Sequence, residues 1–512
     1  MKYNRMPIEI EAPEEYGYEN IKYNLSESSI TDQSLGSLGL QVPDLKLLYN
    51  EHQGGTALRK LVIQGSEGLT HEDVLITTGA AGALFIIASS QLSVNDHLVV
   101  VRPNYATNLE TPRALGCEIS FIDLAFETGF QLDVSAVKAA IKPNTKVVSI
   151  TTPHNPTGTG MSLETLNALV ALTKDNGLIL LVDETYADIS FDGRLPIAAS
   201  LGDHVISVSS LSKSYGIPGI RLGWLINKNP SLQETFLAAK EQISISGSVV
   251  DEWIAERVLS RKEEILSATI REMKDRREIV AAWIEKDDLL EWVRPDGGVV
   301  CFPHIKKGFE PAGGLAAFYH RLLHKYGTYV GPGHWFELPD TFFRLGYGWP
   351  TIEELKGSLL CSPHVYSSLF SMAPTTGEED LSILLATMQP MLDPRTYVFL
   401  TTKDPLDSLP LATLKPQLVV QEDEGTTLVT TESLAESHGF KEPVFPCKKI
   451  SLKIHSSLEA VGLIAAISNR LKNDGISTNV VSGYFHDHIY VPKGRAEDAM
   501  RALADLVEEA KK

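Results

Sequence analysis

One lysine among small residues, at positions 207–224, constrains this chain more than any other feature of its sequence. Lys213 is flanked by serines and glycines, and Arg221 follows a short distance on. A lysine in a tight, partly dry pocket can lose its proton and attack an aldehyde, forming a Schiff base. The hydroxyls of Ser210 and Ser212, with the guanidinium of Arg221, can bind a phosphate nearby. The segment therefore predicts a cofactor with an aldehyde and a phosphate; the alternative is a glycine-rich surface loop with an incidental lysine.

The same segment resembles a known motif. Its matching positions are Ser210, Ser212, Lys213, Gly216, Gly219 and Arg221. They are similar to the motif Ser-x-Ser-Lys-x-x-Gly-x-x-Gly-x-Arg of fold type I aminotransferases, which use pyridoxal phosphate (PLP). The resemblance extends to about residue 360. It implies an α/β fold, with a doubly wound, mostly parallel sheet in a large domain and a small α/β domain beside it.

A short apolar strand from Val74 runs into a glycine turn and then an apolar helix, at Gly79, Ala80 and Ala81. A strand that leads through a glycine into a helix presents free backbone N–H groups and the positive helix end to an anion. We expect the cofactor phosphate to bind here. A plain strand-to-helix connection, which needs small residues only for packing, is the alternative.

Other candidate residues follow the apolar strands that come later in the chain: Tyr105, Asn155, Asp183 and Tyr186. In open α/β sheets, ligands bind at the carboxyl ends of the strands. By the family resemblance, Tyr105 stacks on the pyridine ring, and Asn155 and Tyr186 hydrogen-bond the phenolic oxygen. Asp183 is placed to hold a proton on the ring nitrogen, which keeps the cofactor an effective electron sink. The alternative for Asp183 is a helix cap at a strand end.

Two further residues are assigned by resemblance. Tyr49 matches a family tyrosine that reaches across a dimer interface to the partner's cofactor phosphate, which implies a homodimer with shared active sites. Arg344 lies on a short apolar strand, where an unpaired arginine calls for an anion. The family arginine at this place holds the substrate α-carboxylate, beside Asn155. An internal ion pair with a glutamate is the alternative for Arg344.

Composition excludes several classes of function. The net charge is −19, which disfavours nucleic acid and anionic membranes as partners. Hydrophobic residues make up 43% and charged residues 22%, as in soluble globular proteins. The four cysteines have no metal-ligand spacing, and the N-terminus lacks an apolar signal core. We therefore expect a cytoplasmic protein with reduced thiols, no membrane span and no metal.

The order of elements predicts five segments. Residues 1–45 are the N-terminal part of the small domain, 46–290 the PLP-binding large domain, 291–361 the small domain and 362–377 a linker. Residues 378–512 contain a strand-helix-strand-strand-helix pattern, part of a ferredoxin-like unit, and we expect their first half to be a degenerate copy. This tail resembles ACT-like domains, which bind amino acids as effectors. A helix expected over 459–473 would contain Gly462, which removes the glycine expected in the preceding loop.

These features predict PLP-dependent transamination between an amino acid and a 2-oxo acid. The same cofactor residues serve PLP-dependent lyases, decarboxylases and cyclases, so these remain alternatives. A PLP-binding regulator or amino-acid sensor without turnover is a further alternative. DNA-binding regulators of this kind carry a basic helix-turn-helix module, whereas this chain is acidic.

Overall fold

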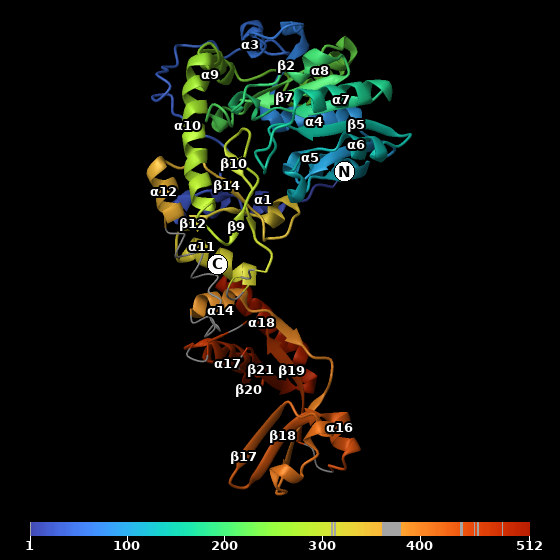
Figure 1. The fold of residues 1–512 in the computed structure, drawn as a ribbon, viewed down its shortest axis with the longest axis vertical. Coiled ribbons are helices and arrows are strands. Elements are labelled where there is room, and N and C mark those ends of the chain that lie inside the picture. Colours follow the sequence, from blue (N-terminus) through green and yellow to red (C-terminus); the bar gives the residue numbers. More distant parts are fainter. Residues whose placement is uncertain are drawn as a thin grey trace. The chain divides into compact units, whose positions relative to one another are not determined.

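The computed structural model of the chain describes residues 2–308, 311, 314–360, 380–440, 444–454, 456–457, 460–483 and 485–511. The chain divides into two compact units (Figure 1). The first consists of Met1–Phe309 and Leu322–Ser367, and the second of Glu310–Arg321 and Ser368–Lys512. The expected linker, 362–377, lies outside the described residues. The limits of the five predicted segments stay predictions.

A seven-stranded sheet, in the order β2-β8-β7-β6-β5-β3-β4, forms the centre of the first unit. Strand β8 pairs antiparallel with both of its neighbours, and the other four pairings are parallel. The strands are β2 (Val74–Thr78), β3 (His97–Arg102), β4 (Glu118–Asp123), β5 (Thr145–Thr151), β6 (Ile179–Asp183), β7 (Val205–Ser210) and β8 (Leu222–Ile226). Six strands therefore end at one edge, and β8 begins there.

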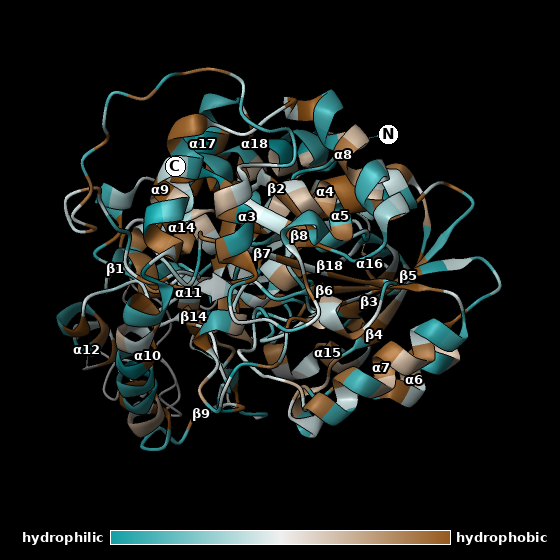
Figure 2. Cartoon of the chain, turned by 90° about the horizontal axis from the view of Figure 1, so that it is seen from above, coloured by the Kyte–Doolittle hydropathy of each residue, from teal (hydrophilic) through white to brown (hydrophobic). Residues whose placement is uncertain are grey.

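Both faces of this sheet are buried, which explains why its strands are continuous apolar runs. In β6, Leu181 packs into one hydrophobic cluster while Leu180 and Val182 pack into another on the opposite face. Figure 2 shows the strands of this sheet largely in brown, the hydrophobic end of the scale.

Helices cover the two faces. One cluster includes side chains from α4 (Gly79–Gln91), α5 (Ala106–Leu115) and α8 (Pro230–Ser244). The other includes side chains from α6 (Val134–Ala140) and α7 (Leu163–Asp175). A third cluster packs α3 (Thr56–Val62) and α9 (Val249–Leu259) against β2 and β8. This is the doubly wound arrangement that the sequence predicts.

Shorter elements complete the first unit. The N-terminal segment joins it through β1 (Tyr23–Asn24), which pairs parallel with β12 (Thr328–Tyr329). The remaining helices are α1 (Pro7–Ile10), α2 (Pro13–Tyr16), α10 (Lys262–Ile284) and α12 (Ile352–Leu360), and α11 (Gly314–His324) spans the sequence division between the units. The remaining strands are β9 (Leu290–Glu291), β10 (Val300–Cys301), β11 (His304–Ile305), β13 (Gly331–Pro332) and β14 (Phe343–Gly346).

The second unit is built on an antiparallel sheet in the order β17-β18-β16-β19-β21-β20, with β15 also paired to β19. Its strands are β15 (Pro390–Leu392), β16 (Tyr397–Thr402), β17 (Leu418–Glu422), β18 (Gly425–Thr431), β19 (Val444–Leu452), β20 (Asn479–Ser482) and β21 (Asp487–Pro492). Its helices are α14 (Leu381–Thr387), α15 (Leu411–Leu414), α16 (Glu432–Ser437), α17 (Leu463–Asn473) and α18 (Ala496–Ala510). The order β19-α17-β20-β21-α18 is the predicted strand-helix-strand-strand-helix pattern.

The expected start of α17 was wrong. The helix begins at Leu463, and Gly462 is the residue that caps it, with a φ of 106°. A positive φ favours glycine and interrupts a right-handed helix. Gly462 therefore lies before the helix, where a loop glycine is expected in an ACT-like domain.

A close approach between β8 and α4 gives a first prediction. A Cβ at Gly223 would lie 2.5 Å from the carbonyl carbon of Gly79 and 2.6 Å from the Ala80 nitrogen. Neither backbone atom can move without displacing the start of α4. We expect Gly223→Ala to lower the free energy of unfolding by about 2 kcal/mol, measured by chemical denaturation.

Gly82→Ala is the matched control, because its nearest neighbour atom would lie 3.5 Å away, at ordinary contact distance. Within a helix this change is expected to add roughly 0.5–1 kcal/mol of stability. Equal stabilities of the two variants would contradict the close-approach argument.

Candidate active site

A cavity of about 420 Å³ opens at the edge of the large sheet where the parallel strands end. Ten of the residues singled out from the sequence line it. They are Ala80, Ala81, Tyr105, Asn155, Asp183, Tyr186, Ser210, Ser212, Lys213 and Arg221. The topology thus brings into one cavity side chains that are far apart in the sequence.

Lys213 follows β7, and its side chain is partly buried in the cavity wall. Its Nζ donates a hydrogen bond to Ser28 Oγ at 3.0 Å. Burial lowers the pKa of the Lys213 amine. The negative charges of Glu27 and Glu14 oppose this change, and the positive charges of Arg344 and Arg221 support it. A lowered pKa increases the fraction of neutral amine, which is the form that attacks a carbonyl carbon.

Asp183 is the last residue of β6, and its side chain is buried. Its Oδ1 accepts hydrogen bonds from the Thr185 backbone nitrogen at 3.1 Å and from Thr185 Oγ1 at 2.6 Å. Burial raises the pKa of Asp183, although these hydrogen bonds oppose that change. No cationic side chain of the described residues lies within 4 Å of it. The protonated pyridine nitrogen of PLP would compensate this buried carboxylate.

Asp183 calls for a cation, whereas the first turn of α4 offers a place for an anion. No side chain caps this helix end at Thr78, which leaves its first backbone N–H groups available, and Ala80 and Ala81 of this turn line the cavity. The Arg221 guanidinium lies beside Gly79, since a Cβ on that glycine would be 2.8 Å from Arg221 Nη2. Gly79 itself does not line the cavity. Helix end and guanidinium together fit the phosphate of PLP.

Arg344 is buried and does not line the cavity. Its Nη1 donates to Asn155 Oδ1 at 3.2 Å and its Nη2 to the Ser26 carbonyl at 2.7 Å, while Nε has no partner in the described structure. Burial lowers the pKa of Arg344. Among the residues described, no carboxylate lies within 4 Å of it, so the internal ion pair considered from the sequence is not found there.

Tyr186 is also buried, and its hydroxyl donates to the Ser28 carbonyl at 2.8 Å. The oxygen of the hydroxyl can still accept a hydrogen bond. Ser28 thus contacts both Lys213 and Tyr186. Neither Ser28 nor the nearby Glu27, which also lines the cavity, was found from the sequence.

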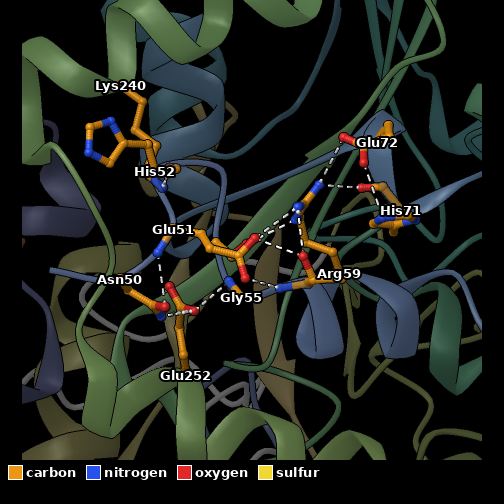
Figure 3. A network of polar contacts seen from close by, with 11 residues as sticks. Asn50, Glu51, His52, Gly55, Arg59, His71, Glu72, Lys240 and Glu252 are labelled. Carbon is orange, nitrogen blue, oxygen red and sulfur yellow. Dashed lines mark hydrogen bonds and ion pairs between the residues drawn. The ribbon is translucent and has the colours of Figure 1, made fainter. Parts of the chain in front are cut away.

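Tyr49 does not line the cavity of its own chain; its side chain is 76% exposed. The residues that follow it are held in place by polar contacts (Figure 3). Asn50 Nδ2 and the Gly55 nitrogen both donate to Glu252 Oε2, the latter at 2.7 Å. Lys240 Nζ donates to the His52 carbonyl. The network fixes the base of a segment whose tyrosine is exposed and lies outside the cavity of its own chain.

Other types of site are not apparent in the described part of the chain. No group of three or more potential metal-ligating side chains comes together within it. Among its helices, none has both the length and the apolar content needed to cross a membrane. The cysteines Cys117, Cys301 and Cys447 are buried and unpaired.

Comparison with known proteins identifies the family. The model of aminotransferase class I and II matches residues 47–356, more than half of the chain. The chain belongs to this family. The PLP dependence, the assignment as an aminotransferase and the type I fold expected from the sequence are thereby confirmed. Two ACT domain models match residues 376–448 and 444–505, so the first half of the tail, expected to be a degenerate copy, is itself similar to an ACT domain.

Individual relatives are distant. Arginine–pyruvate transaminase AruH of Pseudomonas aeruginosa is 29% identical over 56% of this chain and 74% of its own length. Capreomycidine synthase of Streptomyces vinaceus is 26% identical over 66% of this chain and 89% of its own length. A crystal structure of a PLP-dependent aminotransferase from Streptococcus suis is 28% identical, with a TM-score of 0.67, and covers 73% of this chain and all of that one.

The buried Asp183 gives a prediction for the aminotransferase without its cofactor. Because the pKa is raised in the folded protein, the carboxyl ionises at lower pH in the unfolded chain, where its pKa is about 4. Above that pH, ionisation favours unfolding. Asp183→Asn keeps an oxygen for both Thr185 hydrogen bonds and removes the charge. We expect it to stabilise the cofactor-free protein by roughly 1 kcal/mol at neutral pH.

The gain in stability should vanish below about pH 4, where the Asp183 carboxyl is protonated in the folded and in the unfolded protein alike. Denaturation at several pH values checks this, with the exposed Asp192→Asn as a control that should show no such pH dependence. A variant Asp183→Asn that is less stable at neutral pH, or equally stabilised in acid, would argue against a costly buried charge.

Proposed function

We propose that this enzyme transfers an amino group from an amino acid to a 2-oxo acid, with Lys213 as the residue that binds the cofactor. The observation that supports this most directly is the position of a buried amine, a buried carboxylate and an anion-binding helix end in one cavity. These three groups match the aldehyde, ring nitrogen and phosphate of PLP. When bound, PLP supplies an aldehyde for the amine and a ring that withdraws electrons from the substrate α-carbon.

The residues of the chain have separate tasks. Lys213 Nζ, whose pKa burial lowers, takes a proton from the substrate α-carbon and returns it on the cofactor side. Asp183 keeps a proton on the ring nitrogen, and Tyr105 packs against the ring. Ala80, Ala81, Ser210, Ser212 and Arg221 bind the phosphate. Asn155 and Tyr186 orient the phenolic oxygen.

Arg344 binds the α-carboxylate of the substrate in this proposal. It is a buried cation whose hydrogen bonds go to neutral oxygens, of Asn155 and Ser26, and its Nε is unpaired. A carboxylate that reached it would replace a weak neutral partner with a charge-assisted one. The exchange would also draw the Asn155 amide towards the substrate.

The central test is a half-reaction. The purified enzyme with an amino donor and no 2-oxo acid should convert the bound cofactor to its pyridoxamine form, seen as a change in its absorbance spectrum, and release one 2-oxo acid per site. Adding a 2-oxo acid should restore the original spectrum. Release of ammonia or carbon dioxide without a pyridoxamine phase would favour a lyase or decarboxylase, and no spectral response to any amino donor would favour a sensor.

We further propose a homodimer in which Tyr49 contacts the partner's cofactor phosphate. Leu47, Leu48 and Tyr49 are consecutive, large and exposed, with 79%, 62% and 76% of their surface accessible. Such an apolar run on a fixed base is typical of a contact surface. The exposed Tyr49 cannot serve its own cavity, which it does not line.

Mixing two inactive variants tests this arrangement. Lys213→Ala retains Tyr49 but lacks the reacting amine, and Tyr49→Ala retains the amine. After unfolding and refolding together, the mixed dimers hold one site with both residues, so about a quarter of the wild-type activity should return. No recovery, or full activity of Tyr49→Ala alone, would contradict a tyrosine supplied by the partner.

We also propose that the two ACT domains bind an amino acid that alters the rate. With Gly462 at the start of α17 and not inside it, the loop before this helix has the glycine that the resemblance requires. A variant without residues 376–512 should keep its turnover and lose the response. If both forms respond alike to every amino acid in a panel, the ACT domains have no such role.

A further inference from the structure

The catalytic cavity contains more negative charge than the proposed cofactor needs. Its wall includes three carboxylates from the N-terminal segment, at Glu14, Glu27 and Asp32, besides Asp183. The positive residues of the wall, Lys213 and Arg221, are assigned to the aldehyde and the phosphate. In the described residues, none of the three N-terminal carboxylates has a cation within 4 Å. A cavity lined by carboxylates that form no ion pair of their own attracts cations.

Glu27 is the most enclosed of the three, since its side chain is half-buried while Glu14 and Asp32 are exposed. Its Oε1 accepts a hydrogen bond from the Tyr18 hydroxyl at 2.9 Å. The Tyr18 ring stacks on Trp349 with a centroid distance of 6.0 Å. This leaves the other carboxylate oxygen of Glu27 without a partner in the described structure.

The three carboxylates lie close enough to Tyr18 for all of their negative charges to affect its hydroxyl. Burial raises the pKa of its hydroxyl, and the negative charges of Glu27, Glu14 and Asp32 raise it further. The phenol therefore stays a neutral donor to Glu27 and does not compensate its charge. Asp32 likewise accepts only a neutral hydrogen bond, from Trp349 Nε1 at 2.9 Å.

The residues on both sides of Glu27 accept hydrogen bonds from residues of the proposed reaction. Before it, the Ser26 carbonyl accepts from Arg344 Nη2 at 2.7 Å. After it, the side-chain oxygen Oγ of Ser28 accepts from Lys213 Nζ at 3.0 Å. Glu27 is therefore held between the arginine proposed to bind the α-carboxylate and the lysine proposed to move the proton.

Gly346 provides independent evidence that the backbone of Glu27 is closely packed. A Cβ at this residue would lie 1.8 Å from the Glu27 carbonyl oxygen, so only glycine permits the observed approach. Gly346 also donates its backbone N–H to the Leu25 carbonyl at 2.7 Å. The strand that carries Arg344, β14, thus contacts the backbone of Glu27 itself.

We propose that Glu27 determines substrate specificity by binding the positively charged side chain of the amino donor, so that the enzyme acts on amino acids with a guanidinium or ammonium group. This rests on the proposed transamination, because it places the donor's α-carboxylate at Arg344 and its α-carbon at Lys213. A cationic side chain gains a charge-assisted hydrogen bond to the carboxylate. A neutral side chain of the same shape dehydrates the carboxylate without that compensation. Glu14 and Asp32 add a longer-range attraction that salt screens.

Arginine and citrulline provide the sharpest comparison, because they have nearly the same shape and differ in side-chain charge. The wild-type kcat/KM in the half-reaction should favour arginine by about tenfold or more, as a charge-assisted hydrogen bond at a half-exposed site provides. Glu27→Gln should remove most of that preference by lowering kcat/KM for arginine and changing citrulline by less than about threefold.

The matched control is Glu19→Gln. Glu19 is an exposed glutamate of the same N-terminal segment that does not line the cavity. Its variant should keep the wild-type preference, which shows that a general loss of negative charge is not the cause. An unchanged preference in Glu27→Gln, an equal loss for both donors, or a wild-type preference for neutral or acidic donors would overturn the proposal.

Binding without reaction separates this inference from the proposed function. Analogues of arginine and citrulline with hydrogen in place of the α-amino group lack the reacting amine. Their Kd for the cofactor-loaded enzyme, measured by calorimetry, therefore does not depend on turnover. Glu27→Gln should weaken the cationic compound about tenfold and leave the neutral one nearly unchanged. If no donor gives a pyridoxamine form but this binding difference is present, transamination fails and the assignment of Glu27 stands. Equal Kd values for the two compounds in the wild type overturn the assignment of Glu27 whatever the turnover.

Discussion

The amine of Lys213 lies in a cavity wall, 3.0 Å from Ser28 Oγ, and burial there lowers its pKa. The other features of the site depend on this position. An amine in water at neutral pH is almost entirely protonated and cannot attack a carbonyl carbon. The protein removes the Lys213 amine from water by placing it where the end of β7 meets the N-terminal segment.

The large sheet explains how one cavity holds the remaining groups. Six of its strands end at the same edge, so residues that follow β3, β5, β6 and β7 come together there. Strand β8 runs in the opposite direction and begins at this edge, which brings Arg221 next to the first turn of α4. The close contact at Gly223 secures this arrangement. The sheet thus sets a negative group at Asp183 and a positive one at Arg221, as the two ends of the cofactor require.

The sequence predicted the parts of the site that depend on local pattern and strand order. Tyr105, Asn155 and Asp183 each follow an apolar run, and the ends of parallel strands share an edge, so their convergence was expected. The contribution of Ser28 and Glu27 was not, because it depends on contacts with Lys213 and Arg344 that no local pattern encodes. Gly462 was misplaced because an apolar periodicity does not show where a positive φ interrupts a helix. Tyr49 lies outside the cavity of its own chain, so its assignment depends on a second subunit.

The covalent site can be measured directly. Reduction of the PLP-loaded enzyme with borohydride, followed by proteolysis and mass spectrometry, locates any lysine bonded to the cofactor. The account predicts that the added mass of the reduced cofactor lies on Lys213 alone, and that Lys213→Ala carries none. A label on another lysine, or no label on a protein that has taken up PLP, would contradict it.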